Sequence, residues 1–328
     1  VSIGLMRTSR SLPFVPGDDR HKMEKACGVG ADSPILNLAD AAVPNHKAQA
    51  RERVRDALLG LDFRGSERLV RINPIETGLA LDDLTVTMAG HPDGYVVPKL
   101  RSEDDVRFID RALSTLEAIT HRPQGSVGLV LLATETPEAI LNIRRIAQAS
   151  LRSVAMMWAS EDLSNAIGAR RSRKTDGSIP DVFTFARSAC LLAAAAVGME
   201  ALDMPFFDFH DDAGLDREAC EAAEMGFTGK AAIHPAQVPI INRVFVPTRE
   251  EVEEANALLQ AANEAFARGQ AAFVFNGAMV DAPHINRARK IVARAASAPA
   301  TPGAGEENRP RRPRPGASCC SSRSTTPT

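Results

Sequence analysis

Residues 127–158 read VGLVLLATETPEAILNIRRIAQASLRSVAMMW, and the order of patterns in this stretch decides the fold class. It opens with a short apolar run, Val127–Ala133, continues with helical periodicity over Pro137–Gln148, and closes with a second apolar run, Ser153–Trp158. Short runs that are mostly apolar are typical of strands buried on both faces of a parallel sheet. The stretch therefore predicts a strand, a helix and a second strand of the α/β class.

The same alternation extends from about residue 9 to residue 235. The other strand candidates in this range are Leu12–Val15, Pro34–Leu38, Leu69–Ile72, Tyr95–Pro98, Ala201–Met204 and Ala231–Ile233. Further amphipathic stretches, typical of helices, are His46–Leu59, Ser102–Ile119 and Arg217–Met225. Eight strand candidates favour a (β/α)₈ TIM barrel over residues 1–245, with a doubly wound open sheet as the alternative. No G-x-G-x-x-G or P-loop pattern opens a helix, which weakens that alternative.

A second region follows the last strand candidate. Arg249–Arg268 has the pattern of a long amphipathic helix, and a further helix is predicted near His284–Ala296, after Ala272–Asn276 and Gly277–Asp281. We expect residues 246–297 to form a C-terminal helical extension of the barrel. From Ala298 onward the chain is rich in Pro, Arg, Ser and Thr and lacks apolar periodicity, so residues 298–328 are predicted to be a disordered tail.

Composition excludes several classes of protein. The net charge is −2, and the chain has a single Trp and a single Tyr, so nothing favours a nucleic-acid partner. The longest apolar run, near Leu191–Val197, is far shorter than the ~20 residues that a membrane span needs. The five cysteines are scattered and form no C-x-x-C pair, which argues against a zinc site or a disulfide framework. These features predict a cytoplasmic protein with a small-molecule ligand.

Polar side chains follow several of the strand candidates, and in a barrel the reactive residues gather at the carboxyl ends of the strands. The side chains in question are Asn37, Asp40, Arg71, Asn73, Lys99, Glu135, Glu161, Asp162 and His234. Glu135 and Asp162 suit Mg²⁺, which prefers one or two carboxylates beside water and substrate oxygens. The spacing of the two residues leaves a second interpretation open, because a carboxylate at this point can simply begin a helix.

Four cationic side chains near the predicted strand ends also have two interpretations each. Arg71 can hold a carboxylate through two hydrogen bonds, or it can form a structural ion pair at the rim. Lys99 leaves the same two possibilities open. Lys22 and Lys25 lie one helical turn apart after the first strand, where they can meet phosphates or form a solvated helix face.

Taken together, the motifs resemble those of the HpcH/HpaI aldolase/citrate lyase family, and specifically its citrate lyase beta-subunit-like CoA-ester lyases. The resemblance covers nearly all of residues 9–296. Its motifs are RSLPFVPGD (10–18), GADSPILNLADAAV (30–43), VRIN (70–73), VPK (97–99), TET (134–136), SEDL (160–163), the segments 208–215 and 226–237, and GAMVDAP (277–283).

The resemblance implies a role for each matching residue. Glu135 and Asp162 would bind Mg²⁺, with Mn²⁺ as a possible substitute, and Arg71 would hold the keto-acid portion and stabilise the enolate. Asp281 would be an acid/base that reaches the site of a neighbouring subunit, which implies a homotrimer or a hexamer. From position and charge, we expect substrate contacts from Asn37, Asp40 and Lys99, and CoA contacts from Arg10, Lys22 and Lys25.

The implied reaction is a retro-Claisen cleavage of a 3-hydroxy-carboxyacyl-CoA of the citryl-, malyl- or citramalyl-CoA type, giving a keto acid and acetyl-CoA. Two positions depart from the family pattern, because Asn37 stands where an aspartate is usual and Ala39 where a glutamate is usual. Their loss removes negative charge near the expected metal. Three alternatives therefore stay open, namely a malyl-CoA-type thioesterase, a pyruvate aldolase on the same scaffold, and a non-catalytic acyl-CoA-binding relative.

Overall fold

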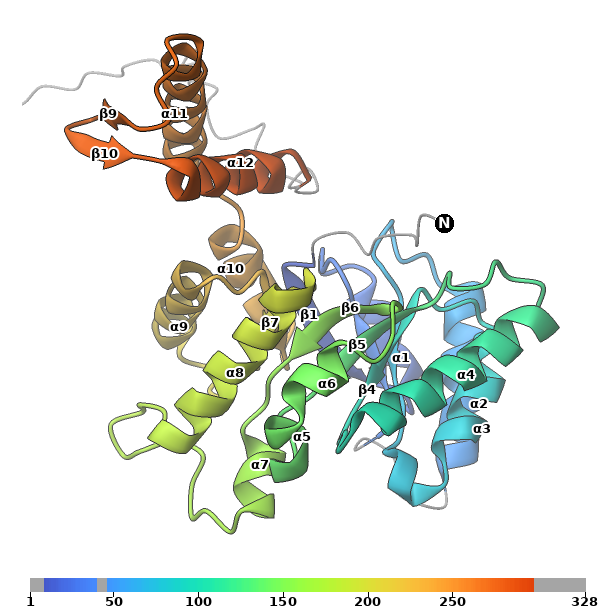
Figure 1. Ribbon diagram of the computed structural model, residues 1–328. Coiled ribbons are helices and arrows are strands. Elements are labelled where there is room, and N and C mark those ends of the chain that lie inside the picture. Colours follow the sequence, from blue (N-terminus) through green and yellow to red (C-terminus); the bar gives the residue numbers. More distant parts are fainter. Residues whose placement is uncertain (1–8, 40–45, 298–328) are drawn as a thin grey trace, which may run out of the picture. The chain divides into compact units, whose positions relative to one another are not determined.

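The strands close into a parallel barrel in which each strand pairs with its neighbours in sequence order and β8 pairs with β1 (Figure 1). The computed structural model describes residues 9–39 and 46–297. The strands are β1 (Ser11–Pro16), β2 (Ile35–Asn37), β3 (Leu69–Arg71), β4 (Gly94–Val97), β5 (Gly128–Leu132), β6 (Ser153–Met157), β7 (Glu200–Asp203) and β8 (Gly229–Ala232). All eight strand candidates match these strands within two residues at each end. The predicted TIM barrel is therefore confirmed.

Helices surround the barrel. They are α1 (Arg20–Ala26), α2 (Lys47–Gly60), α3 (Ala80–Met88), α4 (Glu103–Ile119), α5 (Pro137–Leu141), α6 (Ile143–Ala147), α7 (Glu161–Ala166), α8 (Asp181–Val197), α9 (Asp212–Met225) and α10 (Gln237–Val244), with a short 3₁₀ turn at Ile75–Thr77. The helix expected over Pro137–Gln148 is broken at Asn142, whose φ of −107° and ψ of 8° lie outside the helical range.

Two apolar layers hold the barrel together. Val130 and Leu132 of β5 point into the barrel, whereas Leu129 and Leu131 pack against the surrounding helices. Because successive side chains of a strand point to opposite faces, both sets must be apolar when both faces are covered. This explains why the strand was visible in the sequence as an uninterrupted apolar run.

The amino ends of the strands are joined by ion pairs. Arg10, just before β1, binds Asp32, just before β2, with an Nε–Oδ2 distance of 2.7 Å. Arg68, before β3, binds Asp93, before β4, at 3.0 Å. We call these two pairs the amino-rim pairs. They lie at the end of the barrel opposite to the one where catalytic residues gather, and contacts at this end serve the stability of the fold.

The C-terminal extension has its own small core, in which Ala262, Val280 and Ile285 are buried. Its helix α11 (Arg249–Ala267) begins with a capping box, and a hairpin of β9 (Phe273–Phe275) and β10 (Ala278–Val280) leads into α12 (Ala282–Ser297). The hairpin turns at Asn276 and Gly277, whose φ angles of 49° and 79° suit a two-residue turn. The tail expected at 298–328 lies outside the described residues.

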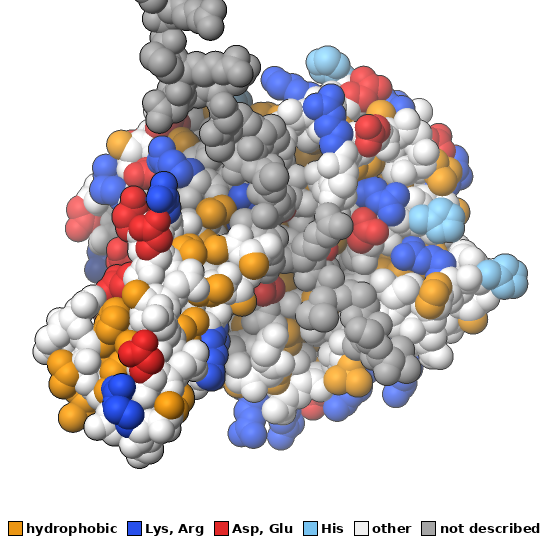
Figure 2. Space-filling model, turned by 90° about the horizontal axis from the view of Figure 1, so that it is seen from above, with side chains coloured by type: hydrophobic (Ala, Val, Ile, Leu, Met, Phe, Trp, Pro, Cys, Tyr) orange, Lys and Arg blue, Asp and Glu red, His pale blue; other side chains and the backbone are white. Residues whose placement is uncertain are grey.

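The surface carries mixed charges. On the face shown in Figure 2, acidic and basic side chains are interspersed, in keeping with the net charge of −2. No helix in ranges 9–39 and 46–297 is both long enough and apolar enough to cross a bilayer.

Candidate active site

Side chains from neighbouring strands meet at the carboxyl end of the barrel. Arg71 is the last residue of β3, Lys99 follows β4, Glu135 follows β5, and Asp162 lies in the first turn of α7, after β6. Because parallel strands present their carboxyl ends at one rim, four consecutive strands bring these groups together. We call Arg71, Lys99, Glu135 and Asp162 the rim cluster.

Arg71 is held in place by a carboxylate and an aromatic ring. Its Nη2 donates to Oε1 of Glu135 at 3.2 Å, and its guanidinium carbon lies 5.6 Å from the centre of the Phe14 ring. Arg71 and Glu135 are only 7% and 3% exposed. A guanidinium fixed in this way is oriented before any ligand arrives, which favours recognition of a carboxylate.

Lys99 connects the two carboxylates of the rim cluster. Its main-chain N–H donates to Oε2 of Glu135 at 2.6 Å, and its ammonium nitrogen lies 3.0 Å from Oδ1 of Asp162. Its φ of 52° is uncommon for a residue other than glycine. Backbone strain of this kind concentrates at functional sites, because the surrounding structure must hold it.

The electrostatics of the rim cluster favour a further cation. The pKa of Glu135 is raised to about 7, chiefly by burial and also by the nearby Asp162, although Arg71 and Lys99 act in the opposite direction. Because the pKa of Glu135 stays raised despite the charges of Arg71 and Lys99, further positive charge beside this buried carboxylate would stabilise its ionised form. A divalent ion held by Glu135 and Asp162 would supply that charge.

The donor set indicates which ion fits. Zn²⁺ takes three or four protein ligands, whereas Mg²⁺ binds through one or two carboxylates and keeps its other positions for water and substrate oxygens. Glu135 and Asp162 thus fit Mg²⁺.

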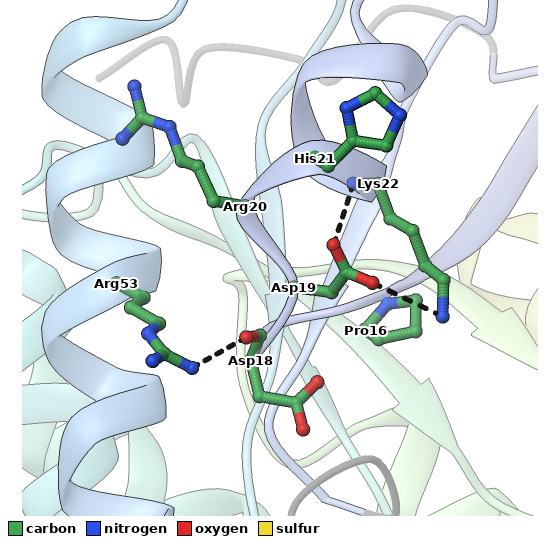
Figure 3. A pocket seen from close by; sticks show the side chains of 7 residues that line it. All are labelled: Pro16, Asp18, Asp19, Arg20, His21, Lys22 and Arg53. Carbon is green, nitrogen blue, oxygen red and sulfur yellow. Dashed lines mark hydrogen bonds and ion pairs between the residues drawn. The ribbon is translucent and has the colours of Figure 1, made fainter.

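A surface pocket of about 650 Å³ lies at the loop between β1 and α1 (Figure 3). Its lining is mostly charged and comprises Pro16, Asp18, Asp19, Arg20, His21, Lys22 and Arg53. Arg53 donates to the main-chain oxygen of Asp18 at 2.7 Å, and the Lys22 ammonium lies 3.4 Å from Asp19. This pocket also lies at the carboxyl end of the barrel, and its cations suit an anionic ligand.

The structure places three other predicted residues at different points of the barrel. Arg10 is 5% exposed and is engaged by Asp32 at the amino rim, so it is not placed to meet a ligand at the carboxyl end. Lys25 lies in the last turn of α1 and is not among the residues lining the pocket. Asn37 ends β2, where its Oδ1 accepts from the main-chain N–H of Ala39 at 3.0 Å.

Two further predicted residues require separate comment. Asp40 lies outside the described residues. Asp281 is exposed and lies between β10 and α12 in the extension, where its Oδ1 is 2.6 Å from Nδ1 of His284. Sequence reasoning missed both His284 and Phe14. His284 could have been found from its spacing of one helical turn from Asp281. Nothing in the sequence marked Phe14, whose ring lies beneath Arg71.

Comparison with known proteins now identifies the class. Residues 10–235 match the family model for HpcH/HpaI aldolase/citrate lyase, which spans most of the chain. The chain belongs to this family of carbon–carbon lyases, and the resemblance drawn from its motifs is confirmed.

Individual relatives agree with this assignment. The citrate lyase beta subunit of Escherichia coli is 33% identical over 88% of this chain and 94% of its own length. The mitochondrial citramalyl-CoA lyase of Mus musculus is 31% identical over 88% of this chain and 86% of its own. Among solved structures, protein CitE of Mycobacterium tuberculosis, in complex with magnesium, acetoacetate and coenzyme A, has a TM-score of 0.72 at 32% identity. The match covers 88% of this chain and 98% of the CitE chain.

Proposed function

We propose that this protein is a Mg²⁺-dependent CoA-ester lyase that cleaves a 3-hydroxy-carboxyacyl-CoA into a keto acid and acetyl-CoA. The observation that carries the proposal is the rim cluster, which combines two carboxylates with a pre-oriented guanidinium. The similarity to a citramalyl-CoA lyase, and to a CitE structure that contains magnesium and coenzyme A, supports the same reaction class.

In this proposal the rim cluster binds the acid portion of the substrate. Glu135 and Asp162 hold Mg²⁺, and Arg71 donates hydrogen bonds to the substrate carboxylate and to the oxygen that becomes the keto group. When bound, the ion supplies Lewis-acid polarisation of that oxygen. Lys99 adds positive charge beside Asp162, and the burial of Arg71 and Glu135 strengthens the interactions of those two side chains.

The proton transfers fall to Asp281. Its carboxylate removes the proton from the C3 hydroxyl as the bond between C2 and C3 breaks, and the bond electrons pass to the thioester enolate. The keto acid is then one product, and protonation of the enolate at C2 gives acetyl-CoA as the other. A well-placed general acid or base contributes roughly 10²–10⁴ in rate.

The pocket at the β1–α1 loop is the proposed site for the CoA phosphates. Arg20, Lys22 and Arg53 bring cationic groups to it, and phosphates are recognised through such groups. Lys22 keeps the role expected from its position. Arg10 pairs with Asp32 at the amino end of the barrel, so this proposal draws the phosphate contacts from Lys22 and its neighbours.

Asp281 is proposed to act in the barrel of a neighbouring copy, which requires a homo-oligomer, either a trimer or a hexamer. Beside Asp281, the cross-strand neighbours Val274 and Met279 are each 74% exposed. Exposed apolar side chains next to a functional carboxylate favour a face that is covered in the assembly.

The proposal is tested by mixing purified protein with malyl-, citramalyl- and citryl-CoA, with and without Mg²⁺, while keto acid and free thiol are measured separately. We expect Mg²⁺-dependent keto acid that is lost in Glu135→Gln. The matched control is Glu161→Gln, which changes a neighbouring carboxylate outside the rim cluster.

Each other outcome supports a different function. Free thiol without keto acid would identify a thioesterase, and pyruvate released from a hydroxy acid without CoA would identify an aldolase. A folded protein that binds acyl-CoA and makes no product would be a non-catalytic relative. In that case the charge missing at Asn37 and Ala39 would be the first cause to examine, by Asn37→Asp and Ala39→Glu.

A further inference from the structure

The extension presents an imidazole–carboxylate pair formed by His284 and Asp281. Asp281 belongs to the motif at 277–283, whereas His284 lies just outside it. Nδ1 of His284 lies 2.6 Å from Oδ1 of Asp281, and both residues are exposed. This distance suits a hydrogen bond in which His284 donates Nδ1–H to the Asp281 carboxylate.

The pair is formed by the first turn of α12. The main-chain oxygen of Asp281 accepts from the N–H groups of His284 and Ile285 at 3.1 and 3.2 Å, so this turn is already helical. Side chains three positions apart on a helix lie on the same face. The imidazole is thus held beside the carboxylate by the backbone and does not depend on a long flexible side chain.

The junction that carries the pair is anchored on both sides. Val280, just before Asp281, is 3% exposed and pairs with Phe273 across the hairpin. Ile285, just after His284, is 2% exposed in the core of the extension. Buried neighbours on either side fix the backbone of Asp281 and His284, while their side chains stay accessible.

We propose that His284 is the positioning residue for Asp281. This inference rests on the proposed function, in which Asp281 moves the substrate proton. By donating Nδ1–H to Oδ1, the imidazole occupies one carboxylate oxygen and sets the rotamer of the side chain. Oδ2 is then the oxygen that takes the proton from the C3 hydroxyl. Orientation of a reacting group matters because a misplacement of about 1 Å can cost roughly 10² in rate.

The first test is kinetic and uses the full-length protein with its best CoA ester and Mg²⁺. We expect His284→Ala to lower kcat about ten- to a hundredfold with KM changed less than about twofold, because the substrate is bound elsewhere. His284→Asn, whose side-chain N–H can stand near the position of Nδ1, is expected to recover most of the lost kcat. Asn286→Ala, in the same exposed turn, is the matched control and keeps the wild-type kcat.

The second test separates positioning from a general effect on the extension. In an Asp281→Ala background, which is expected to lower kcat by roughly 10²–10⁴, the further change His284→Ala lowers kcat no more. A double variant that is slower than Asp281→Ala, by the factor seen for His284→Ala alone, would show that the two residues act independently and would overturn the inference.

A third measurement needs no activity. In protein with ¹⁵N-labelled histidine, the ring nitrogens of His284 are expected to show protonation at Nδ1, and Asp281→Ala is expected to shift the proton toward Nε2. An unchanged tautomer in Asp281→Ala overturns the contact. A further outcome is that the tautomer shifts in Asp281→Ala but neither Asp281→Ala nor any other variant changes kcat. In that case the proposed role of Asp281 fails, and the positioning role of His284 fails with it.

Discussion

At the scale of single residues, Arg71 combines two contacts that a lysine cannot reproduce. Its guanidinium donates to Glu135 and lies over the Phe14 ring at the same time, which suits a flat cation that carries several donors. The side chain is therefore oriented by its surroundings.

Replacing Arg71 by lysine is expected to lower kcat/KM by roughly 10²-fold, since the fork that aligns the substrate is lost. Steady-state kinetics with the best CoA ester measures this change, and the melting temperature reports on folding. Arg68→Lys, at the amino end of the same strand, is the control and is expected to keep kcat/KM. Equal losses in both variants would contradict a specific role for Arg71.

The sequence predicted which residues form the rim cluster, but it did not predict their geometry. The rim cluster was anticipated from polar residues after each strand candidate, because the carboxyl ends of parallel strands share one rim. The bond between the Lys99 N–H and Glu135 could not be anticipated, since it depends on a φ of 52° that no neighbouring glycine signals. The helical spacing of His284 from Asp281 was visible but has many structural explanations.

At the scale of elements, the end of α4 is tied to the starts of two strands through Glu117, which is fully buried. Arg152, just before β6, donates to Glu117 from both terminal nitrogens at 2.7 Å, and the N–H groups of Gly125 and Val127 donate to it as well. Burial by itself would raise the pKa of Glu117. The hydrogen bonds from Arg152, Gly125 and Val127 outweigh that effect, so the pKa is lowered.

Glu117→Gln is expected to lower the free energy of unfolding at pH 7 by about 3 kcal/mol, because Arg152 loses its buried partner. The sign of the pH effect follows from the lowered pKa. The carboxylate stabilises the fold fully above its unfolded pKa, near 4.3, and this contribution is lost as the pH falls through the folded value. Urea unfolding at pH 7 and pH 4 should therefore show a smaller pH dependence in the variant. An equal dependence in both proteins would disprove this account.

The closure between β8 and β1 depends on one glycine. A Cβ at Gly229 would lie 2.0 Å from the main-chain oxygen of Ser9 and 2.8 Å from that of Arg10. Gly229→Ala is expected to destabilise the fold by at least about 2 kcal/mol, measured by thermal unfolding. Gly28→Ala, whose Cβ would meet only an ordinary contact at 3.6 Å, is the control and should stay within about 1 kcal/mol of wild type. Similar losses at both positions would argue against a special role for the β8–β1 closure.

Helices were harder to predict than strands, for a physical reason. Strands covered on both faces are apolar throughout, and their short length separates them from their surroundings. Helix α8 escaped the sequence analysis because its outward face is also apolar, with Val182, Phe185 and Leu192 exposed, so no amphipathic contrast marks it. Asn142 broke an expected helix whose apolar pattern continues through it.

At the scale of the whole molecule, the proposed site needs two copies of the chain. The rim cluster belongs to the barrel, whereas Asp281 belongs to an extension with a separate core. No periodicity or composition of a single chain reports how its copies assemble, so the oligomer was expected from the family resemblance alone.

Co-expression of Glu135→Ala and Asp281→Ala chains with different tags tests this arrangement. Each homo-oligomer is expected to be inactive, whereas mixed oligomers should regain activity at about one site in four, where an intact rim cluster meets an intact Asp281 from its neighbour. Activity of the doubly tagged fraction is the measurement. A doubly tagged fraction without activity would mean that Asp281 acts within its own chain or not at all.

The amino-rim pairs have a consequence for laboratory evolution. Arg10–Asp32 and Arg68–Asp93 join the strands at the amino end of the barrel. The rim cluster and the pocket at the β1–α1 loop lie at the carboxyl end. Libraries that randomise the loops after Pro16 and Asn37 leave the amino-rim pairs unchanged. We expect a large share of such library members to fold. The preference for the acyl group of the substrate can then change while the barrel stays folded.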